Sequence, residues 1–231
     1  EMARRYGAAV VALTINEKGM AMTTEEKVDT AKQIYDLAVN EHGLRAQDIL
    51  FDMLTFTIGS GDETLRDAGG QTIEAIRQIK QVLPGVFTVL GVSNISFGLR
   101  PPARKVLNSV MVHECVEAGL DAAIVDAAKI VPLAQINDEE KELALDLLYD
   151  RVKDPKKKPL MIFIDYYEDK EDQDETDESE TFKQAETQLN QKILKGDREG
   201  LDDVLAMLMA RYQPLAIINE ILVPAMREVG V

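Results

Sequence analysis

Along the first 150 residues, short apolar runs alternate with longer amphipathic stretches four times in succession. Each apolar run has the length of a β-strand, and its nearly continuous hydrophobicity indicates a strand that is covered on both faces. Each stretch that follows repeats apolar residues at helical spacing. The expected strands are residues 8–15, 49–56, 86–93 and 122–125, and the expected helices are residues 24–43, 65–83, 101–119 and 138–149.

A strict succession of strands and helices predicts a parallel sheet joined by right-handed crossovers. Two architectures satisfy this pattern: an open sheet with helices on both faces, and part of a (β/α)8 barrel. The four units occupy about 150 residues, whereas a complete barrel needs ~250 residues. The residue pattern alone leaves both architectures open.

The pattern changes after residue 150. Residues 160–167 form a short apolar and aromatic run, which predicts an edge strand or a flap packed on the barrel. The acidic stretch that follows is too highly charged to fold alone, so we expect a mobile, solvated linker over residues 168–181. From Leu189 the spacing is helical again, with one helix ending near Tyr212 and a second beginning at Pro214. Two short amphipathic helices are typical of half a four-helix bundle.

The net charge of −15 is distributed unevenly. Residues 165–180 contain ten acidic residues and one lysine, which account for −9, and the remaining chain carries −6. An acidic chain without a basic stripe argues against nucleic acid and anionic membranes as partners. The acidic run also lacks the regularly placed glycines of a calcium loop, so we predict no metal site.

The hydrophobic fraction of 45% is that of a soluble globular protein. No apolar run reaches the ~18 residues that a bilayer span needs, and no basic segment precedes an apolar stretch as in a signal peptide. The single cysteine, Cys115, lies on the apolar face of an expected helix and is interpreted as a small core residue. These features favour a reducing, cytoplasmic location. Because the chain begins with Glu1, we expect that its natural start is missing.

The polar residues that end the apolar runs are the candidates for chemistry, because ligands of parallel α/β folds bind at the C-terminal ends of the strands. Asn94 lies within residues 89–100, where a buried strand ends and the chain leads into a helix. An amide there can donate and accept hydrogen bonds, but Asn and Ser also favour turns for purely local reasons. Asp52 stands within an apolar run, where a carboxylate is costly to bury unless it is paired. It either binds a ligand or caps a neighbouring loop.

Four motifs resemble the pterin-binding domain of the cobalamin-dependent methionine synthase family. They are Gly-Val-Ser-Asn-Ile-Ser-Phe at residues 91–97, Tyr-Gly-Ala-Ala-Val-Val at 6–11, Asp-Ile-Leu-Phe-Asp at 48–52 and Gly-Leu-Asp-Ala-Ala-Ile-Val at 119–125. The resemblance runs from about residue 4 to residue 151 and resumes near residue 189. It favours the barrel, because these units resemble the fifth to eighth units of the family's (β/α)8 TIM-type barrel.

The resemblance implies an α/β fold: the C-terminal half of a (β/α)8 barrel, an acidic linker and two helices of a helical-bundle cap. We accordingly divide the chain into a partial pterin-binding barrel at residues 1–155, a linker at 156–185 and a partial cobalamin cap at 186–231. The family's first four barrel units, its cobalamin-ligating domain and its zinc-containing homocysteine domain have no counterpart here. We therefore expect a fragment that is inactive alone.

The implied reaction is transfer of the methyl group from N5 of methyltetrahydrofolate to cob(I)alamin, within methionine synthesis from homocysteine. The family places a pterin-binding carboxylate at Asp52 and the amide that contacts N5 at Asn94, so these two are the implied catalytic residues. This chain departs from the family's Asp-Pro-Asn at residues 52–54, where it reads Asp-Met-Leu. The candidates for folate binding are Asn16, Asp52, Asn94, Ser96, Arg100 and Asp126. The implied partners are the small-molecule folate and the cobalamin domain of the same longer protein.

Two other functional classes remain open. A corrinoid-protein methyltransferase or a dihydropteroate synthase-like enzyme would share the pterin chemistry, although neither needs a fused helical cap. The second class is a non-catalytic interaction fragment, because half a barrel leaves unpaired strand edges that favour association with another chain.

Overall fold

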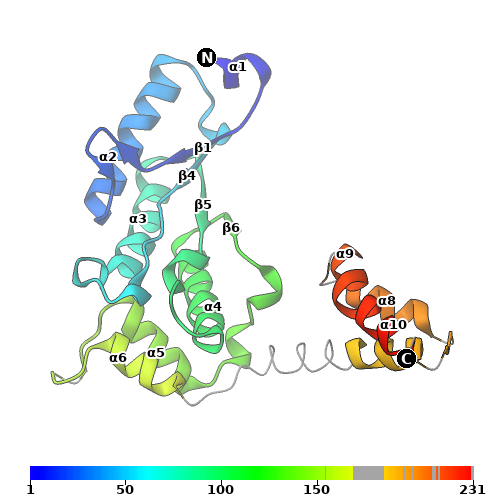
Figure 1. The fold of residues 1–231 in the computed structure, drawn as a ribbon. Helices are drawn as coiled ribbons and strands as arrows, with labels where there is room; N and C mark the ends of the chain where they lie inside the picture. Colours follow the sequence, from blue (N-terminus) through cyan, green and yellow to red (C-terminus); the bar gives the residue numbers. More distant parts are fainter. Residues whose placement is uncertain are drawn as a thin grey trace. The chain divides into compact units, whose positions relative to one another are not determined.

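A computed structural model describes residues 1–153, 155–168, 185–194, 196–198, 200–209, 212 and 214–229. The chain divides into two compact units, Glu1–Lys170 and Glu171–Val231 (Figure 1). Residues 169–184, the larger part of the predicted linker, lie outside the described residues, and the predicted mobility of that stretch lies there too.

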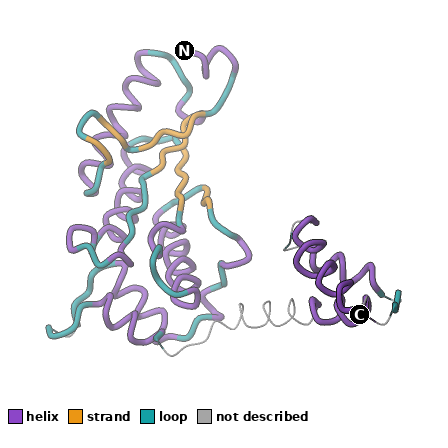
Figure 2. The backbone as a smooth tube through the Cα atoms, in the orientation of Figure 1, coloured by secondary structure: helices purple, strands orange, loops and turns teal. Residues whose placement is uncertain are grey.

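The first unit is built on a parallel sheet whose strand order follows the chain order (Figure 2). Its strands are β1 (Val10–Leu13), β4 (Ile49–Asp52), β5 (Phe87–Gly91) and β6 (Ala122–Ile124). The register pairs Leu13 with Asp52 and Asp52 with Val89, so β1 and β4 end level with each other. A short antiparallel hairpin, β2 (Ile15–Asn16) and β3 (Gly19–Met20), follows β1.

Helices connect these strands as the apolar pattern predicts. They are α1 (Met2–Tyr6), α2 (Thr24–Tyr35), α3 (Ala68–Val82), α4 (Pro101–Ala118), α5 (Asp138–Leu148) and α6 (Pro159–Tyr167). A capping box begins α2, where Thr23 accepts from the Glu26 N–H and the Glu26 side chain accepts from the Thr23 N–H. At the other end of a helix, Gly119 closes α4 with φ of 105°, a conformation that favours glycine.

The strand order distinguishes between the two architectures that the sequence left open. Consecutive parallel strands joined by right-handed crossovers place their helices on one face of the sheet, as in a (β/α) barrel. The opposite face is open: Val11 and Leu13 of β1 are 54% and 44% exposed, and Ile124 of β6 is 64% exposed. The prediction of strands covered on both faces is therefore wrong for β1 and β6, because each lies at a sheet edge with helices on only one side.

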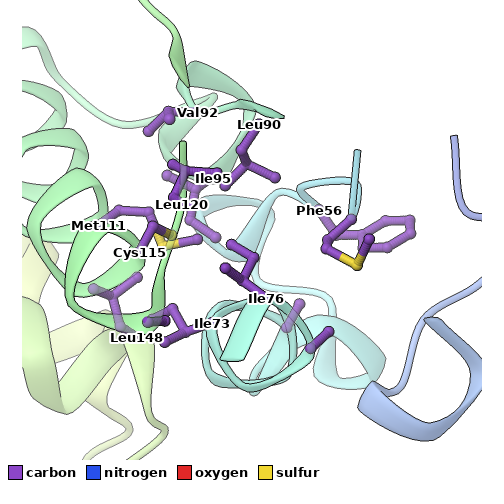
Figure 3. Close-up of a cluster of buried hydrophobic side chains, with 14 of the residues drawn as sticks. Phe56, Ile73, Ile76, Leu90, Val92, Ile95, Met111, Cys115, Leu120 and Leu148 are labelled. Atoms are coloured by element: carbon purple, nitrogen blue, oxygen red, sulfur yellow. The ribbon is translucent and has the colours of Figure 1, made fainter. Parts of the chain in front are cut away.

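The helix-covered face holds the core of the first unit. Side chains that point from the strands toward the helices interdigitate with those of α3 and α4 (Figure 3). Phe51 and Leu90 contribute from the sheet, Ile76 from α3 and Met111 from α4, and all four are fully buried. Cys115 is buried among them, and burial raises the pKa of its thiol to about 12, as suits a core residue without reactivity.

Residues 160–167 form a helix, so the edge strand offered by the sequence is wrong, whereas packing on the barrel is confirmed. Pro159 occupies the first turn of α6, where its missing N–H costs nothing. Phe163 and Tyr167 lie one turn apart and are buried in the core of the first unit. The first compact unit thus extends past residue 155, to Lys170.

The described residues of the second unit are mainly helical. It contains a helix at residues 185–194, then α8 (Leu201–Met209), α9 (Pro214–Ala216) and α10 (Val223–Val229), with a π-helical stretch over Ile217–Leu222. Leu189, Val204 and Leu208 form its small core. Met209 and Met226 are exposed, because the few helices of this unit cover only a narrow part of each other's surface.

Candidate functional site

Asp52 ends β4 at the C-terminal edge of the sheet. The pleat places it on the open face with Leu13, while Phe51 points into the helix-covered core. Its Oδ1 accepts the Leu54 N–H at 2.8 Å, and Leu54 has a left-handed φ of 58°. Among the described residues no group donates to Oδ2. One carboxylate oxygen therefore holds the turn and the other faces the open side as an acceptor.

The charge on Asp52 is set by burial and by one cation. Burial raises the pKa of Asp52, while the Leu54 N–H and the Lys27 ammonium partly offset that rise. Lys27 is fully buried, and burial lowers the pKa of its ammonium group to about 8, with Asp52 opposing that change. The two groups thus stabilise each other's charged form near neutral pH.

Asn94 stands in the 3₁₀ turn Ser93–Ser96 that follows β5, and its side chain is exposed. Its Nδ2 donates to the Thr55 carbonyl oxygen at 2.5 Å, and its Oδ1 accepts from the Thr57 hydroxyl at 3.1 Å. A backbone carbonyl only accepts, so this contact fixes which end of the amide carries the nitrogen. Each end keeps one further hydrogen-bonding position for a ligand.

Asp52 and Asn94 are connected by one loop, residues 53–57, which leaves the end of β4. Asp52 holds the beginning of this loop through Leu54, and Asn94 holds its end through Thr55 and Thr57. The structure therefore brings together the two residues that the sequence favoured most. The loop ends in a close approach between Gly59 and the turn that carries Asn94, since a Cβ at Gly59 would lie 2.8 Å from the Phe97 carbonyl oxygen.

Ser96 and Arg100, two further predicted folate contacts, both make hydrogen bonds within the protein. Ser96 is fully buried, donates to the Ser93 carbonyl oxygen at 3.2 Å and accepts from the Arg104 Nε at 3.3 Å. Arg100 donates to the Tyr167 carbonyl oxygen at 2.9 Å and also to that of Glu168, at the C-terminal end of α6. Both residues tie neighbouring segments together, and a role toward folate stays a prediction for each.

Asn16 and Asp126 lie beyond the ends of the two edge strands. Asn16 ends β2, which follows β1, and Asp126 comes two residues after β6. Asn16 donates to the Thr30 hydroxyl at 3.0 Å and accepts from the Lys18 N–H at 2.8 Å, which closes the β2–β3 hairpin. Asp126 is exposed and accepts from the Ala128 N–H at 3.2 Å. Each therefore makes at least one local turn contact, and their predicted roles in binding are likewise untested.

Sequence reasoning missed three residues that shape this site: Lys27, Thr55 and Thr57. Lys27 carried a signal, because it precedes Val28 on the face of α2 that points to the core, where a cation needs a partner. The two threonines follow Asp52 in a stretch that reads as a continuing strand, and their contacts with Asn94 depend on where that strand ends.

A cavity of about 520 Å³ lies elsewhere, between residues 58–66 and 147–165. Neither Asp52 nor Asn94 lines it. Within the described residues, no cluster of three or more His, Cys, Asp or Glu side chains is placed to hold a metal ion. No described helix is both long and apolar enough to cross a bilayer.

Two family models match the chain. The model described as pterin binding enzyme matches residues 1–126, and the model described as B12 binding domain matches residues 185–231. The methionine synthase of Mycobacterium leprae is 47% identical over 234 residues, which cover 100% of this chain and 19% of that protein. The methionine synthase of Mycobacterium tuberculosis is 46% identical over 228 residues, which cover 97% of this chain and 19% of that protein. The chain thus spans about a fifth of the length of the curated relatives it matches.

Proposed function

Because the chain belongs to the family of pterin-binding enzymes, we propose that it carries part of the methyltetrahydrofolate site of a methionine synthase. In this function the methyl group on N5 of methyltetrahydrofolate is transferred to cob(I)alamin, within methionine synthesis from homocysteine. The relatives are about five times as long as this chain, so the activity belongs to a longer protein. We propose the division into a partial barrel at 1–155, a linker at 156–185 and a partial cobalamin cap at 186–231.

One observation supports this function most strongly. An acceptor oxygen of Asp52 and the amide of Asn94 stand at the ends of one loop, on the C-terminal edge of a parallel sheet. That edge is where (β/α) barrels bind their substrates. The match of a B12 binding domain to residues 185–231 favours methyl transfer to cobalamin over a dihydropteroate synthase-like reaction.

Asp52 binds the pterin in this proposal. A pterin ring presents N–H donors side by side, and a carboxyl group accepts such donors most strongly when it is ionised. The Oδ2 of Asp52 supplies the acceptor, and Oδ1 stays with the Leu54 N–H. Burial raises the pKa of the Asp52 carboxyl group and the Leu54 N–H lowers it, so this hydrogen bond favours the charged form.

Asn94 acts on N5. A tertiary amine leaves poorly, and protonation of N5 makes it a better leaving group. Before protonation the second N–H of the Asn94 amide can donate to the N5 lone pair, and afterwards the second lone pair of Oδ1 can accept from N5–H. The amide has no proton to give at neutral pH, so the proton arrives through water. The amide turns between these two contacts with N5, and its hydrogen bonds with Thr55 and Thr57 stabilise the orientation seen in the structure. Asn94 thus acts as an electrostatic positioner.

The second unit fits a role beside cobalamin. Met207, Met209 and Met226 are 44%, 57% and 65% exposed, and flexible apolar side chains of this kind suit the apolar rim of a corrin ring. When bound, cobalamin supplies the nucleophile that accepts the methyl group. Zinc belongs to the homocysteine part of the family, and no described cluster in this chain fits it.

The proposed partners are the folate itself and the cobalamin-binding part of the same longer protein. An acidic chain favours neither nucleic acid nor an anionic membrane as a partner. We place the protein in the cytoplasm, in keeping with a single buried and unreactive cysteine.

The test uses the complete protein and, separately, the 231 residues alone. Each is mixed with methyltetrahydrofolate and chemically reduced cobalamin, and methylcobalamin is followed by its absorbance. We expect methyl transfer by the complete protein and none by the isolated chain, because its sheet has an open face on which a pterin is held from one side only.

Two outcomes would contradict this proposal. If the complete protein binds methyltetrahydrofolate but transfers no methyl group, another pterin-dependent reaction is favoured. If it does not bind methyltetrahydrofolate at all, the folate site itself is refuted, and a non-catalytic interaction role becomes the better reading.

A further inference from the structure

Lys27 is a buried cation that the proposed reaction does not explain. It lies on α2, and its side chain is fully removed from solvent. Burying an ammonium group is costly unless it is paired and hydrogen-bonded. A methionine of nearly the same length would fill this space in the core without that cost. The position of the ammonium group therefore calls for a role other than packing.

The contacts of Lys27 converge on the loop that follows β4. Its Nζ donates to the Met53 carbonyl oxygen, and also to the Leu54 carbonyl oxygen at 3.2 Å. The Thr72 hydroxyl of α3 donates to the same Leu54 carbonyl at 3.0 Å. The Lys27 ammonium also lies 4.8 Å from the centre of the Phe56 ring, within cation–π range. One buried charge thus contacts three residues of the loop, Met53, Leu54 and Phe56.

This loop is also the one that joins the two candidate catalytic residues. On its N-terminal side, the Leu54 N–H donates to Asp52; on its C-terminal side, Thr55 and Thr57 contact the Asn94 amide. Leu54 holds a left-handed conformation that a leucine adopts only under constraint. The Lys27 ammonium and the Thr72 hydroxyl supply that constraint, because both donate to the Leu54 carbonyl oxygen from the buried side of the loop.

We propose that Lys27 is a positioning residue of the folate site, which sets the Asp52 carboxylate and the Asn94 amide through the 53–57 loop. This inference rests on the proposed function, because it assigns Lys27 to the same site. Lys27 touches neither the pterin nor N5. It acts through two routes: its hydrogen bonds fix the loop geometry, and its charge favours the ionised form of Asp52.

The charge route predicts a pH signature. Asp52 after β4 and Glu26 on α2 are the charged groups that act on Lys27, and α3 contributes the uncharged Thr72 hydroxyl. Burial raises the pKa of Asp52 and Lys27 lowers it. Removing the Lys27 charge therefore raises the pKa of Asp52 further. Folate binding, which needs the ionised carboxylate, is then lost at a higher pH as the solution is acidified.

The experiment compares Lys27→Met with Lys32→Met in the complete enzyme. Lys32 is the matched control, because it lies on the same helix, is about half exposed and pairs with Asp29 at 3.6 Å. The dissociation constant of methyltetrahydrofolate and the single-turnover rate with reduced cobalamin are measured as functions of pH. For Lys27→Met we expect roughly tenfold weaker binding. We also expect a methyl-transfer rate lower by about a hundredfold. As the pH is lowered, folate binding (the acid limb of its pH profile) should be lost at a higher pH than in the wild type. Lys32→Met should match the wild type.

A second variant separates geometry from charge and covers the case in which Lys27→Met fails to fold. Thr72→Val removes the other donor to the Leu54 carbonyl and leaves the charges unchanged. We expect it to lower the methyl-transfer rate while the acid limb of folate binding keeps its wild-type position. If Thr72→Val transfers methyl at the wild-type rate, the loop is not positioned from this side and the proposal falls.

Other outcomes are equally decisive. If Lys27→Met only lowers thermal stability, and its folate affinity, rate and acid limb match the wild type, Lys27 is a structural residue and the proposal is overturned. A wild-type enzyme that binds no methyltetrahydrofolate would instead overturn the proposed function, and this inference with it. The wild-type binding curve therefore distinguishes the two failures.

Discussion

Asp52→Asn is the substitution that examines the folate contact most closely. The side chain keeps its shape, so Oδ1 can still accept the Leu54 N–H that is 2.8 Å away in the structure. Keeping that contact forces the new amide nitrogen into the place of Oδ2, the oxygen with no donor among the described residues. An N–H group then faces the N–H donors of the pterin, where the proposal requires an acceptor.

The size of the effect follows from this single mismatch. Leaving a partly buried polar group unmatched costs about 1–3 kcal/mol. That range corresponds to roughly a five- to 150-fold increase in the dissociation constant of methyltetrahydrofolate. The turn at Leu54 should persist, because its hydrogen bond to residue 52 survives, so the fold should lose much less stability than the folate complex loses.

The assay is calorimetric titration of the complete enzyme with methyltetrahydrofolate, at a pH where Asp52 is ionised. Asp48→Asn is the matched control, since Asp48 lies at the other end of β4 and pairs with Arg45 at 2.6 Å, away from the site. We expect Asp52→Asn to weaken binding and Asp48→Asn to leave it unchanged. Equal folate affinity in Asp52→Asn and wild type would refute the assignment of Oδ2 to the pterin.

Two further predictions concern the segments around the site. Gly59→Ala should destabilise the protein by about 1–3 kcal/mol, since its Cβ would lie 2.8 Å from the Phe97 carbonyl oxygen. Urea unfolding checks this against Gly91→Ala, whose Cβ meets nothing within 4 Å, and equal midpoints would contradict it. Arg100→Met should loosen the end of α6 by removing its donor to the Tyr167 carbonyl, and should weaken folate binding, because Arg100 is a predicted folate contact. Limited proteolysis and folate titration measure both effects, and wild-type folate affinity with a loosened α6 would contradict the predicted folate contact.

The succession of elements was predictable because each apolar run and each amphipathic stretch has its own period. The ends of the strands were less predictable. Residues 49–56 read as one strand, yet β4 ends at Asp52, because the Asp52 carboxylate takes the Leu54 N–H and Leu54 turns left-handed. Such a turn depends on Lys27 and Thr72, which are distant in sequence, so no local pattern reveals it.

The coverage of the sheet shows what a local pattern can and cannot predict. The continuous apolar run of β1 indicates burial on both faces, yet Val11 and Leu13 are exposed on the open face. The apolar pattern indicates that both faces of a strand are suited to burial. It does not indicate which segment covers each face. A similar limit applies to residues 160–167, where apolar composition is compatible with strand or helix and the one-turn spacing of Phe163 and Tyr167 decides for the helix.

Sequence reasoning identified part of the candidate site. Asp52 and Asn94 are polar residues at strand ends, and parallel strands bring their ends to one edge, so sequence reasoning could place both. Lys27 was missed although it precedes the core residue Val28, because a lysine on a helix is normally solvated and only the fold shows that its ammonium group is enclosed. The supporting threonines, Thr55 and Thr57, became visible only once the strand was seen to end before them.

The Asn94 amide is proposed to stabilise N5 as N5 gains its proton. The substitution Asn94→Ala tests this role most directly. The measurement is the single-turnover rate of methyl transfer to reduced cobalamin, taken beside the dissociation constant of methyltetrahydrofolate in the same complete enzyme. We predict a rate lower by about ten- to a hundredfold with a smaller change in the dissociation constant. A wild-type rate in Asn94→Ala would show that the amide serves only to join the turn to Thr55 and Thr57, and would contradict the catalytic role.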